Sequence, residues 1–208
     1  PSQRGQVQAI ARAYAQAGYA ASTVELVEAH GTSTKVGDAT ELSTLSQLWT
    51  GLPSGDHVAV GSVKSQIGHL KAAAGMAGIL KVAMALHHAT IPPSAGFETP
   101  NPTVDWGENP FFVPTEAREW PRPEGHPRRA GVSAFGFGGT NFHVALEGFD
   151  PEAHHQLAEA WNSRWQERSG GRAPTPSAPS ILDAEATPSL DHEALKALEG
   201  GLLLLSGP

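Results

Sequence analysis

The spacing of apolar residues changes from helical to extended over the first part of the chain. Apolar side chains recur three or four positions apart from Val7 to Tyr14, which predicts a helix. Gly18 suits the left-handed residue that commonly follows a helix. Residues 24–29 then predict a buried strand. Because active-site residues gather where the strands of an α/β sheet end, His30 becomes a candidate functional residue.

The next stretch predicts two further helices with a strand between them. Residues 38–49 predict a helix with Asp38 and Glu41 in its first turn, where carboxylates favour the helix dipole. Residues 57–64 predict a second strand. Residues 68–88 predict a helix that is unusually rich in Ala and Gly. Glycine weakens an isolated helix, so we expect this one to be buried at the centre of a layered fold, where backbones approach closely.

Prolines and glycines then divide the rest of the chain. Residues 91–114 contain several prolines and are expected to be mostly ordered loop with short strands. Residues 129–133 and 142–147 predict paired strands around a glycine-rich turn at 136–141. Together with the preceding elements, they indicate an α/β fold.

The C-terminal region predicts one more helix followed by a linker. Asp150-Pro151 suits an N-cap and the first helical position. An apolar stripe from Leu157 to Trp165, spaced by four, indicates that this helix docks on another surface. Residues 169–200, rich in Pro, Gly and Ala, predict a linker, and residues 201–208 the start of a following unit.

The composition excludes several classes of protein. The 208 residues are 39% hydrophobic and 17% charged, which is typical of a globular protein with one sizeable core and a tail. A net charge of −7 argues against a nucleic-acid surface, and no apolar run approaches the roughly 20 residues that span a membrane. The absence of cysteine excludes disulfides and thiolate metal sites, so we expect a cytoplasmic protein. The chain opens at Pro1 without Met, and we expect further sequence before it.

Two histidines beside glycines are the strongest sign of chemistry. His30 and His69 each lie near a predicted strand end, and a neutral imidazole either transfers protons or donates a hydrogen bond to an oxyanion. Thr32 and Thr34 suit hydrogen bonds to the amides of an extended ligand. Gly138-Gly139 suits a turn that directs backbone N–H groups toward an oxyanion. The set predicts chemistry on a carbonyl or an enolate.

Other types of site have less support. A metal site built from His30, His69 and His143 lacks any recognised ligand spacing, and we expect none. The turn at 136–141 matches neither the dinucleotide-binding pattern nor the phosphate-binding loop of nucleotide-binding proteins. Lys64 considered alone is a solvated surface lysine.

Several neighbouring residues are expected to have purely structural roles. Asp38 and Glu41 are interpreted as capping and packing residues rather than as an acid–base pair. Phe135 and Phe142 are expected in the core.

Five motifs occur in the order and spacing found in the C-terminal halves of β-ketoacyl synthases. They are VEAHGTST, GSVKSQIGH, the Ala/Gly-rich helix, FETPNP and SAFGFGGTNFH. Over residues 1–148 the chain therefore resembles the C-terminal half of a β-ketoacyl synthase (ketosynthase) domain. The resemblance implies a thiolase-like fold, one half of an α-β-α-β-α sandwich that is usually a homodimer. Residues 149–168 would form a helix after the ketosynthase, before the linker at 169–200 and the next unit at 201–208.

The same resemblance implies the catalytic residues. His30 and His69 would be the catalytic histidines, which promote decarboxylation of a malonyl-type extender on acyl carrier protein and stabilise the enolate. Lys64 would order this site electrostatically. The reaction implied is a decarboxylative Claisen condensation with an enzyme-bound acyl group.

The resemblance also implies how the substrate arm is bound. Thr32 and Thr34 would contact the phosphopantetheine arm of the carrier protein. Phe137 would gate the acyl pocket, with Gly138 and Gly139 in the same mobile loop. The chain itself is expected to bind no cofactor.

The missing cysteine determines the expected partners. The family's nucleophilic Cys lies in the N-terminal half of the domain, at a helix start that favours its thiolate. We therefore expect this half as a partner, together with acyl carrier protein, an adjacent acyltransferase-like domain and a second copy of the chain. Two alternatives remain: a loading-type domain that only decarboxylates, and a non-catalytic module that dimerises and docks carrier proteins. KSQIGH favours a polyunsaturated-fatty-acid-like synthase, and FETPNP favours a modular polyketide synthase.

Overall fold

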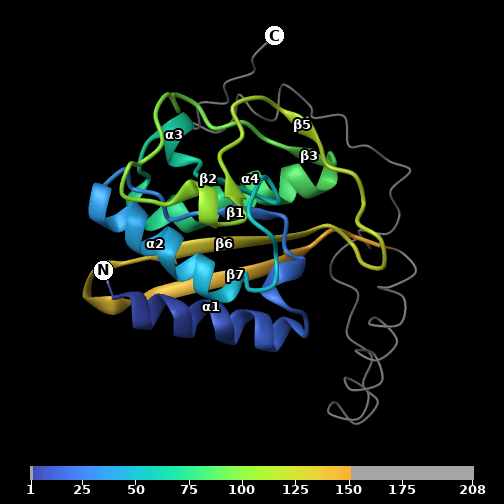
Figure 1. The fold of residues 1–208 in the computed structure, drawn as a ribbon, viewed down its shortest axis with the longest axis horizontal. Coiled ribbons are helices and arrows are strands. Elements are labelled where there is room, and N and C mark those ends of the chain that lie inside the picture. Colours follow the sequence, from blue (N-terminus) through green and yellow to red (C-terminus); the bar gives the residue numbers. More distant parts are fainter. Residues whose placement is uncertain (1, 151–208) are drawn as a thin grey trace, which may run out of the picture. The chain divides into compact units, whose positions relative to one another are not determined.

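A mixed five-stranded sheet forms the centre of the molecule. The computed structural model describes residues 2–150 (Figure 1). The strands of the sheet are β1 (Leu26–Glu28), β2 (Val58–Gly61), β4 (Phe111–Phe112), β6 (Arg129–Phe135) and β7 (Asn141–Glu147). Their order is β4-β2-β1-β6-β7, parallel except for the antiparallel edge strand β7. A separate small sheet pairs β3 (Thr90–Ile91) with β5 (Arg118–Glu119).

Helices cover both faces of the sheet. The α-helices of the described residues are α1 (Gln3–Ala17), α2 (Lys35–Leu48), α3 (Lys64–Ile67) and α4 (Ala74–His87). The pair α1 and α2 packs on one face of the sheet, and α4 packs on the opposite face (Figure 1). The layered α/β architecture predicted from the sequence is therefore confirmed.

The ends of α1 follow from local sequence signals. The side chain of Ser2 accepts a hydrogen bond from the backbone N–H of Gly5. At the other end, Gly18 has φ 78° and its N–H bonds to the carbonyl of Tyr14. The predicted helix and its terminating glycine are both confirmed.

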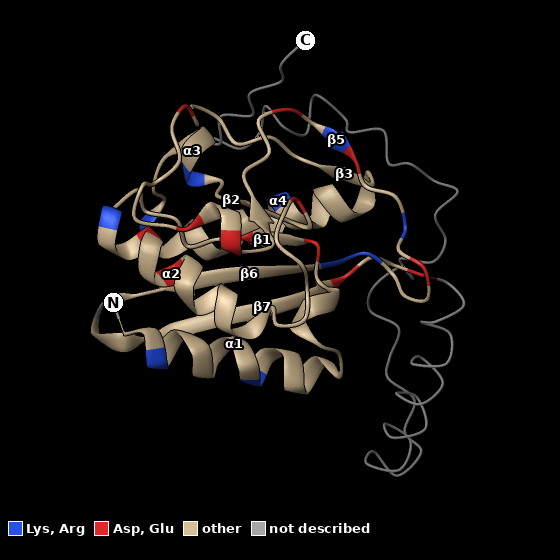
Figure 2. Ribbon diagram, viewed as in Figure 1, with Lys and Arg blue, Asp and Glu red and all other residues tan. Residues whose placement is uncertain are grey.

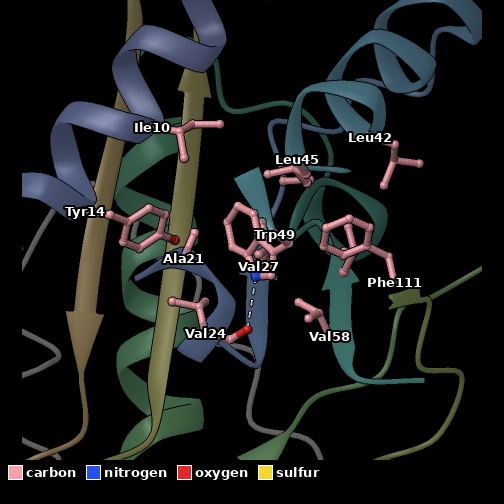
Figure 3. Packing of buried hydrophobic residues seen from close by; sticks show 12 residues of the cluster. Ile10, Tyr14, Ala21, Val24, Val27, Leu42, Leu45, Trp49, Val58 and Phe111 are labelled. Carbon is pink, nitrogen blue, oxygen red and sulfur yellow. Dashed lines mark hydrogen bonds between the residues drawn. The ribbon is translucent and has the colours of Figure 1, made fainter. Parts of the chain in front are cut away.

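The core under α1 and α2 is centred on Trp49 (Figure 3). This residue ends α2 and is 2% exposed. Its indole N–H donates to the carbonyl of Val24 at 3.2 Å, and its ring meets the ring of Tyr14 edge-on at 5.5 Å. Because side chains alternate along a strand, Val27 and Val58 point to this face of the sheet. The cluster joins both helices to the central strands.

The opposite face shows why α4 is rich in small residues. Val82 and Ala85 of α4 pack against apolar side chains of β1 and β6. A Cβ atom at Gly78 would lie 2.9 Å from Glu28 Cγ, and one at Gly75 would lie 3.1 Å from the Ala134 Cβ. The predicted close packing along this helix is confirmed, but the expectation that the helix is buried at the centre is not met within the described residues, because its far side carries the exposed Met76, Leu80 and Met84.

Several predicted elements have different bounds. The helix predicted at 38–49 begins earlier, at Lys35, and the strand predicted at 24–29 is shorter, Leu26–Glu28. The second strand ends at Gly61, and Lys64 begins the short helix α3 instead of ending the strand. The Ala/Gly-rich helix begins at Ala74 rather than at Gly68, because Gly68 and Lys71 have φ values of 75° and 55°, which an α-helix cannot contain.

The expectation that Phe142 lies in the core was wrong. Its side chain is 64% exposed, whereas Phe135 is partly buried against the core. Phe142 lies on edge strand β7, where no other layer of the described residues covers it. The helix predicted from Asp150-Pro151, its Leu157–Trp165 stripe, the linker and the following unit lie outside the described residues.

Replacing Gly131 by alanine is expected to destabilise the protein by roughly 1–3 kcal/mol through overpacking. An added Cβ would collide with the Tyr14 hydroxyl and lie 2.6 Å from Nε2 of His143. Denaturant unfolding checks this, with Gly148→Ala as control, since a Cβ there finds its closest neighbour at 3.5 Å. Equal stability of the two variants would contradict the prediction.

Candidate functional site

The functional residues predicted from sequence meet at one edge of the sheet. Because β1, β2 and β6 run parallel, their carboxyl ends lie together. His30 follows β1, Lys64 follows β2, and the glycine-rich turn follows β6. The rings of His30 and His69 lie nearly perpendicular, with centroids 6.0 Å apart, and the ring of Phe135 is 5.7 Å from that of His30.

Backbone amides fix the orientation of both imidazoles. The N–H of Phe135 donates to Nδ1 of His30 at 3.3 Å, and the N–H of Lys71 donates to Nδ1 of His69 at 3.0 Å. A neutral ring that accepts at Nδ1 carries its proton on Nε2. Both rings therefore present an Nε2–H group as a hydrogen-bond donor.

The surroundings of His30 keep it neutral. Burial lowers its pKa to about 4, and the nearby Lys64 ammonium and His69 act in the same direction. Near neutral pH, His30 is therefore an uncharged donor. The neutral His30 ring is therefore better suited to stabilise a developing oxyanion than to act as a general acid.

Glu41 binds the backbone of His30 and Gly31, which together form the histidine turn. Its Oε1 accepts the N–H of His30 at 2.8 Å and its Oε2 accepts the N–H of Gly31 at 3.0 Å. The side chain is buried, and burial raises its pKa to about 7 although both amide hydrogen bonds oppose this. The turn is also tight, since a Cβ at Gly31 would lie 2.8 Å from the Ser62 Cβ.

The role of Glu41 was missed in the sequence. It lies in the second turn of α2 rather than the first, and it binds backbone eleven residues earlier. No periodic signal marks such a contact. Asp38 lies in the first turn as predicted, and burial raises the pKa of its carboxyl while the backbone N–H groups of Ser33, Thr34 and Thr32 act to lower it.

The two threonines lie in the turn between β1 and α2. Thr34 is exposed and is the N-cap residue of α2, but its side chain makes no capping hydrogen bond. Thr32 is partly buried. Contact of either threonine with a substrate arm remains a prediction.

The turn after β6 brings backbone N–H groups to the same edge. Gly138 and Gly139 have φ values of 77° and 86°, which side chains disfavour, and both are exposed. The N–H of Gly136 bonds to the carbonyl of Thr140 at 2.7 Å and closes the turn. The gating role of Phe137 remains a prediction.

His143 is placed away from the other two histidines. Its Nε2 lies 2.8 Å from the Tyr14 hydroxyl and its Nδ1 lies 3.0 Å from the Ser133 hydroxyl. This buried network joins α1 to the β6–β7 hairpin. Within residues 2–150, no group of three or more His, Asp or Glu side chains is arranged to hold a metal ion.

A cavity of about 500 Å³ lies behind the histidine turn, on the α2 side. Gly31, Glu41, Ser62 and Phe97 are among its lining residues, whereas His30, Lys64 and His69 are not. We therefore locate the candidate chemistry at the open edge of the sheet rather than in the cavity.

Charge and helix length give two further findings. In the view of Figure 2, Lys and Arg are interspersed with Asp and Glu rather than gathered on one face. Among the helices that the structure describes, none has the length and apolar character needed to cross a membrane.

Comparison with known families and proteins agrees with the motifs. The family described as "Beta-ketoacyl synthase, C-terminal domain" matches residues 1–98, and "Ketoacyl-synthetase C-terminal extension" matches residues 100–184. A polyunsaturated fatty acid synthase subunit of Thraustochytrium sp. is 47% identical over 172 residues, which are 80% of this chain and 6% of that protein. A phenolphthiocerol/phthiocerol polyketide synthase subunit of Mycobacterium tuberculosis is 46% identical over 148 residues, 71% of this chain and 8% of that protein.

Solved structures give the same result. The ketosynthase from module 6 of the bacillaene synthase of Bacillus subtilis has a TM-score of 0.68 at 40% identity, covering 72% of this chain and 27% of that one. Ketosynthase twelve of the bacillaene polyketide synthase of Bacillus amyloliquefaciens has a TM-score of 0.68 at 38% identity, with the same two coverages of 72% and 27%. The chain thus spans less than a third of these ketosynthases and less than a tenth of the curated relatives. It has the thiolase-like fold and belongs to the β-ketoacyl synthase family, as the C-terminal part of a ketosynthase domain.

Proposed function

We propose that this chain supplies the histidine half of a condensing ketosynthase domain in a polyketide or polyunsaturated-fatty-acid-like synthase. The pair of Nε2–H donors on His30 and His69, each fixed by a backbone amide at Nδ1, is the observation that carries the proposal. Such a pair suits an oxyanion that forms on a thioester carbonyl. The substrates are an acyl group on Cys of the N-terminal half and a malonyl-type extender on acyl carrier protein.

The proposed reaction begins with loss of carbon dioxide. The bond between the malonyl carboxylate and the α-carbon breaks, and its electron pair moves onto the thioester carbonyl to give an enolate. His30 and His69 donate to that oxygen, because a preorganised donor stabilises developing charge. The enolate carbon then attacks the acyl thioester, forms the new carbon–carbon bond and releases the Cys thiolate.

The remaining predicted residues act on substrate placement. Lys64 orders the electrostatics around His30, whose pKa its charge helps to lower. Thr32 and Thr34 contact the phosphopantetheine arm, while the loop with Phe137, Gly138 and Gly139 controls entry of the acyl chain. Carrier protein, an acyltransferase-like neighbour and a second copy are the proposed partners. The chain's own residues need no bound cofactor for these steps.

An exposed apolar surface supports the N-terminal half as a partner. Met76, Leu80 and Met84 are spaced by four along α4 and are 56–61% exposed. Phe142 and Val144 of β7 are also exposed, and strand alternation places them on the α4 side of the sheet. Several large exposed apolar side chains on one side of a sheet are typical of an interaction site. We assign it to the N-terminal half of the same domain.

Leu80→Glu is expected to prevent association of the two halves, because it places a charge in the middle of this apolar surface. Co-purification of the separately produced halves, or aggregation of the complete domain, measures the effect. Ala15→Glu, on the exposed side of α1, is the matched control. Assembly of the Leu80→Glu variant at the level of the control would show that the surface has another use.

Reconstitution of the complete domain tests the proposed function. Acyl carrier protein loaded with an acyl group and carrier protein loaded with malonyl are supplied together, and intact-protein mass spectrometry follows the products. We expect a β-ketoacyl carrier protein and release of carbon dioxide. Carbon dioxide without an elongated product would identify a loading-type decarboxylase. No change in either substrate would favour a non-catalytic docking module.

A further inference from the structure

A buried ion pair lies directly beneath the proposed site. Glu28 is the last residue of β1, is 2% exposed, and points toward α4. Its Oε2 lies 2.9 Å from Nζ of Lys81, whose side chain is only 12% exposed. The second oxygen, Oε1, accepts the backbone N–H of Val63. The carboxylate therefore ties three segments together: β1, the start of α3, and α4.

The fold leaves room for this pair at Gly78. A Cβ at Gly78 would lie 2.9 Å from Cγ of Glu28, so a side chain on α4 would displace the carboxylate. At Gly61, a Cβ would lie 2.9 Å from Oγ of Ser94 and only in ordinary contact with Nζ of Lys81, at 3.6 Å. The close packing of α4 on the sheet thus accommodates a charged pair as well as an apolar core.

The pair is close to the proposed site in sequence, and its charges interact with Lys64. Val63, which Glu28 holds, immediately precedes Lys64, and Glu28 itself is two residues before His30. The carboxylates of Glu28 and Glu41 both act to raise the pKa of Lys64, against the larger lowering effect of burial. Lys64 in turn helps to keep His30 neutral.

We propose that Glu28 is a positioning residue that, held by Lys81, places the first turn of α3 and sets the charge of Lys64 beside the two histidines. This inference rests on the proposed function for its catalytic meaning. Glu28 reaches the substrate only through Lys64. The titratable groups facing Lys64 are Glu28 from β1, Glu41 from α2 and His30 from the turn after β1, and Lys81 from α4 faces Glu28.

The two partners are expected to act in opposite directions. Glu28→Gln keeps an oxygen that accepts the N–H of Val63 but removes the negative charge that acts to raise the pKa of Lys64, so that pKa should fall. Lys81→Met removes the cation that neutralises Glu28, so the carboxylate acts on Lys64 more strongly and the pKa of Lys64 should rise. A purely structural role would produce no such opposition of sign.

The experiment uses the complete ketosynthase domain with a ¹³Cε-lysine label. The Lys64 signal is assigned by its loss in Lys64→Arg and then titrated in the wild type, Glu28→Gln, Lys81→Met and the double variant. The pH profile of malonyl-carrier-protein decarboxylation is recorded for the same proteins. Glu119→Gln, an exposed carboxylate on β5, is the matched control and should leave both measurements unchanged.

Opposite shifts of the Lys64 titration in the two single variants, with the basic limb of the rate profile following each, support the proposal. Shifts in the same direction, or none, in folded variants overturn it. If a single variant fails to fold, the double variant decides. It is compared with Lys81→Met, from which it differs only in the charge of Glu28, and an equal Lys64 titration and rate in those two proteins would overturn the role of Glu28. If Lys81→Met or the double variant does not fold, Glu28→Gln is compared with the wild type in the same way.

Failure of the proposed function can be told apart from failure of this inference. A wild-type domain that neither decarboxylates nor condenses refutes the function. Opposite shifts of the Lys64 titration in that case would still establish the ion pair as the element that sets the charge of Lys64. Normal condensation with unmoved titrations would retain the function and refute the inference.

Discussion

His30→Ala in the complete domain is expected to lower the rate of condensation by about 10²–10³-fold, the usual cost of removing one preorganised donor to an oxyanion. The alanine cannot donate a hydrogen bond, while Glu41 still binds the backbone at residues 30 and 31 and preserves the turn. Single-turnover formation of the β-ketoacyl product measures the loss. His69→Ala is expected to behave in the same way.

Two further variants test whether hydrogen-bond donation is the role of the His30 ring. His30→Asn keeps an N–H donor near the same place, so partial recovery over alanine is expected if the ring acts as a donor. His87→Ala removes an exposed histidine at the end of α4 and serves as the control. Wild-type rates of decarboxylation and condensation in both His30→Ala and His69→Ala would refute the catalytic assignment.

Replacing Glu41 is expected to have the largest effect on stability. Glu41→Ala leaves the buried N–H groups of His30 and Gly31 without their acceptors, at about 1–3 kcal/mol for each. Condensation should fall as well, because the backbone that carries the His30 ring loses its support. Denaturant unfolding and the condensation rate measure the two effects. Unchanged stability would show that the turn holds its shape without this carboxylate.

The effect of Glu41→Gln should depend on pH. Burial raises the pKa of Glu41 from an ordinary value of 4.5 to about 7, so over this interval the folded protein retains a proton that the unfolded chain releases. Wild-type stability therefore falls as the pH rises from about 4.5 to about 7, by up to roughly 3 kcal/mol. Glutamine does not titrate, so its disadvantage relative to glutamate should be smaller at pH 8 than at pH 5. A difference independent of pH would contradict this.

Local signals allowed much of the fold to be predicted. The helix that ends at Gly18 and the strand that delivers His30 each depend on neighbouring residues alone. The bounds of α3 and α4 were missed because two left-handed residues, Gly68 and Lys71, divide a stretch that is otherwise rich in helix formers. The exposure of Phe142 was missed because an apolar residue in a strand does not reveal whether a second layer covers it.

The sequence motifs predicted the histidines and the lysine of the candidate site, but not the carboxylate contacts that support them. The motifs led to His30, Lys64 and His69, which the structure places at one edge of the sheet. They gave no indication of the contacts of Glu28, which lies within the first motif, or of those of Glu41, although the two carboxylates bind backbone 35 and 11 residues away in the chain. Such contacts depend on how strands and helices are placed in space, and periodicity carries no information about them.

The hydrogen bonds that orient the two imidazoles have a consequence for natural variation. Both donors are main-chain N–H groups, at positions 135 and 71, so the orientation of each ring does not depend on the side chain found there. A substitution that preserves the backbone at these positions therefore keeps the hydrogen bond to each ring. Proline is the exception, because it has no N–H to donate. A proline at either position would remove that hydrogen bond and free one imidazole to turn, even with every catalytic side chain in place.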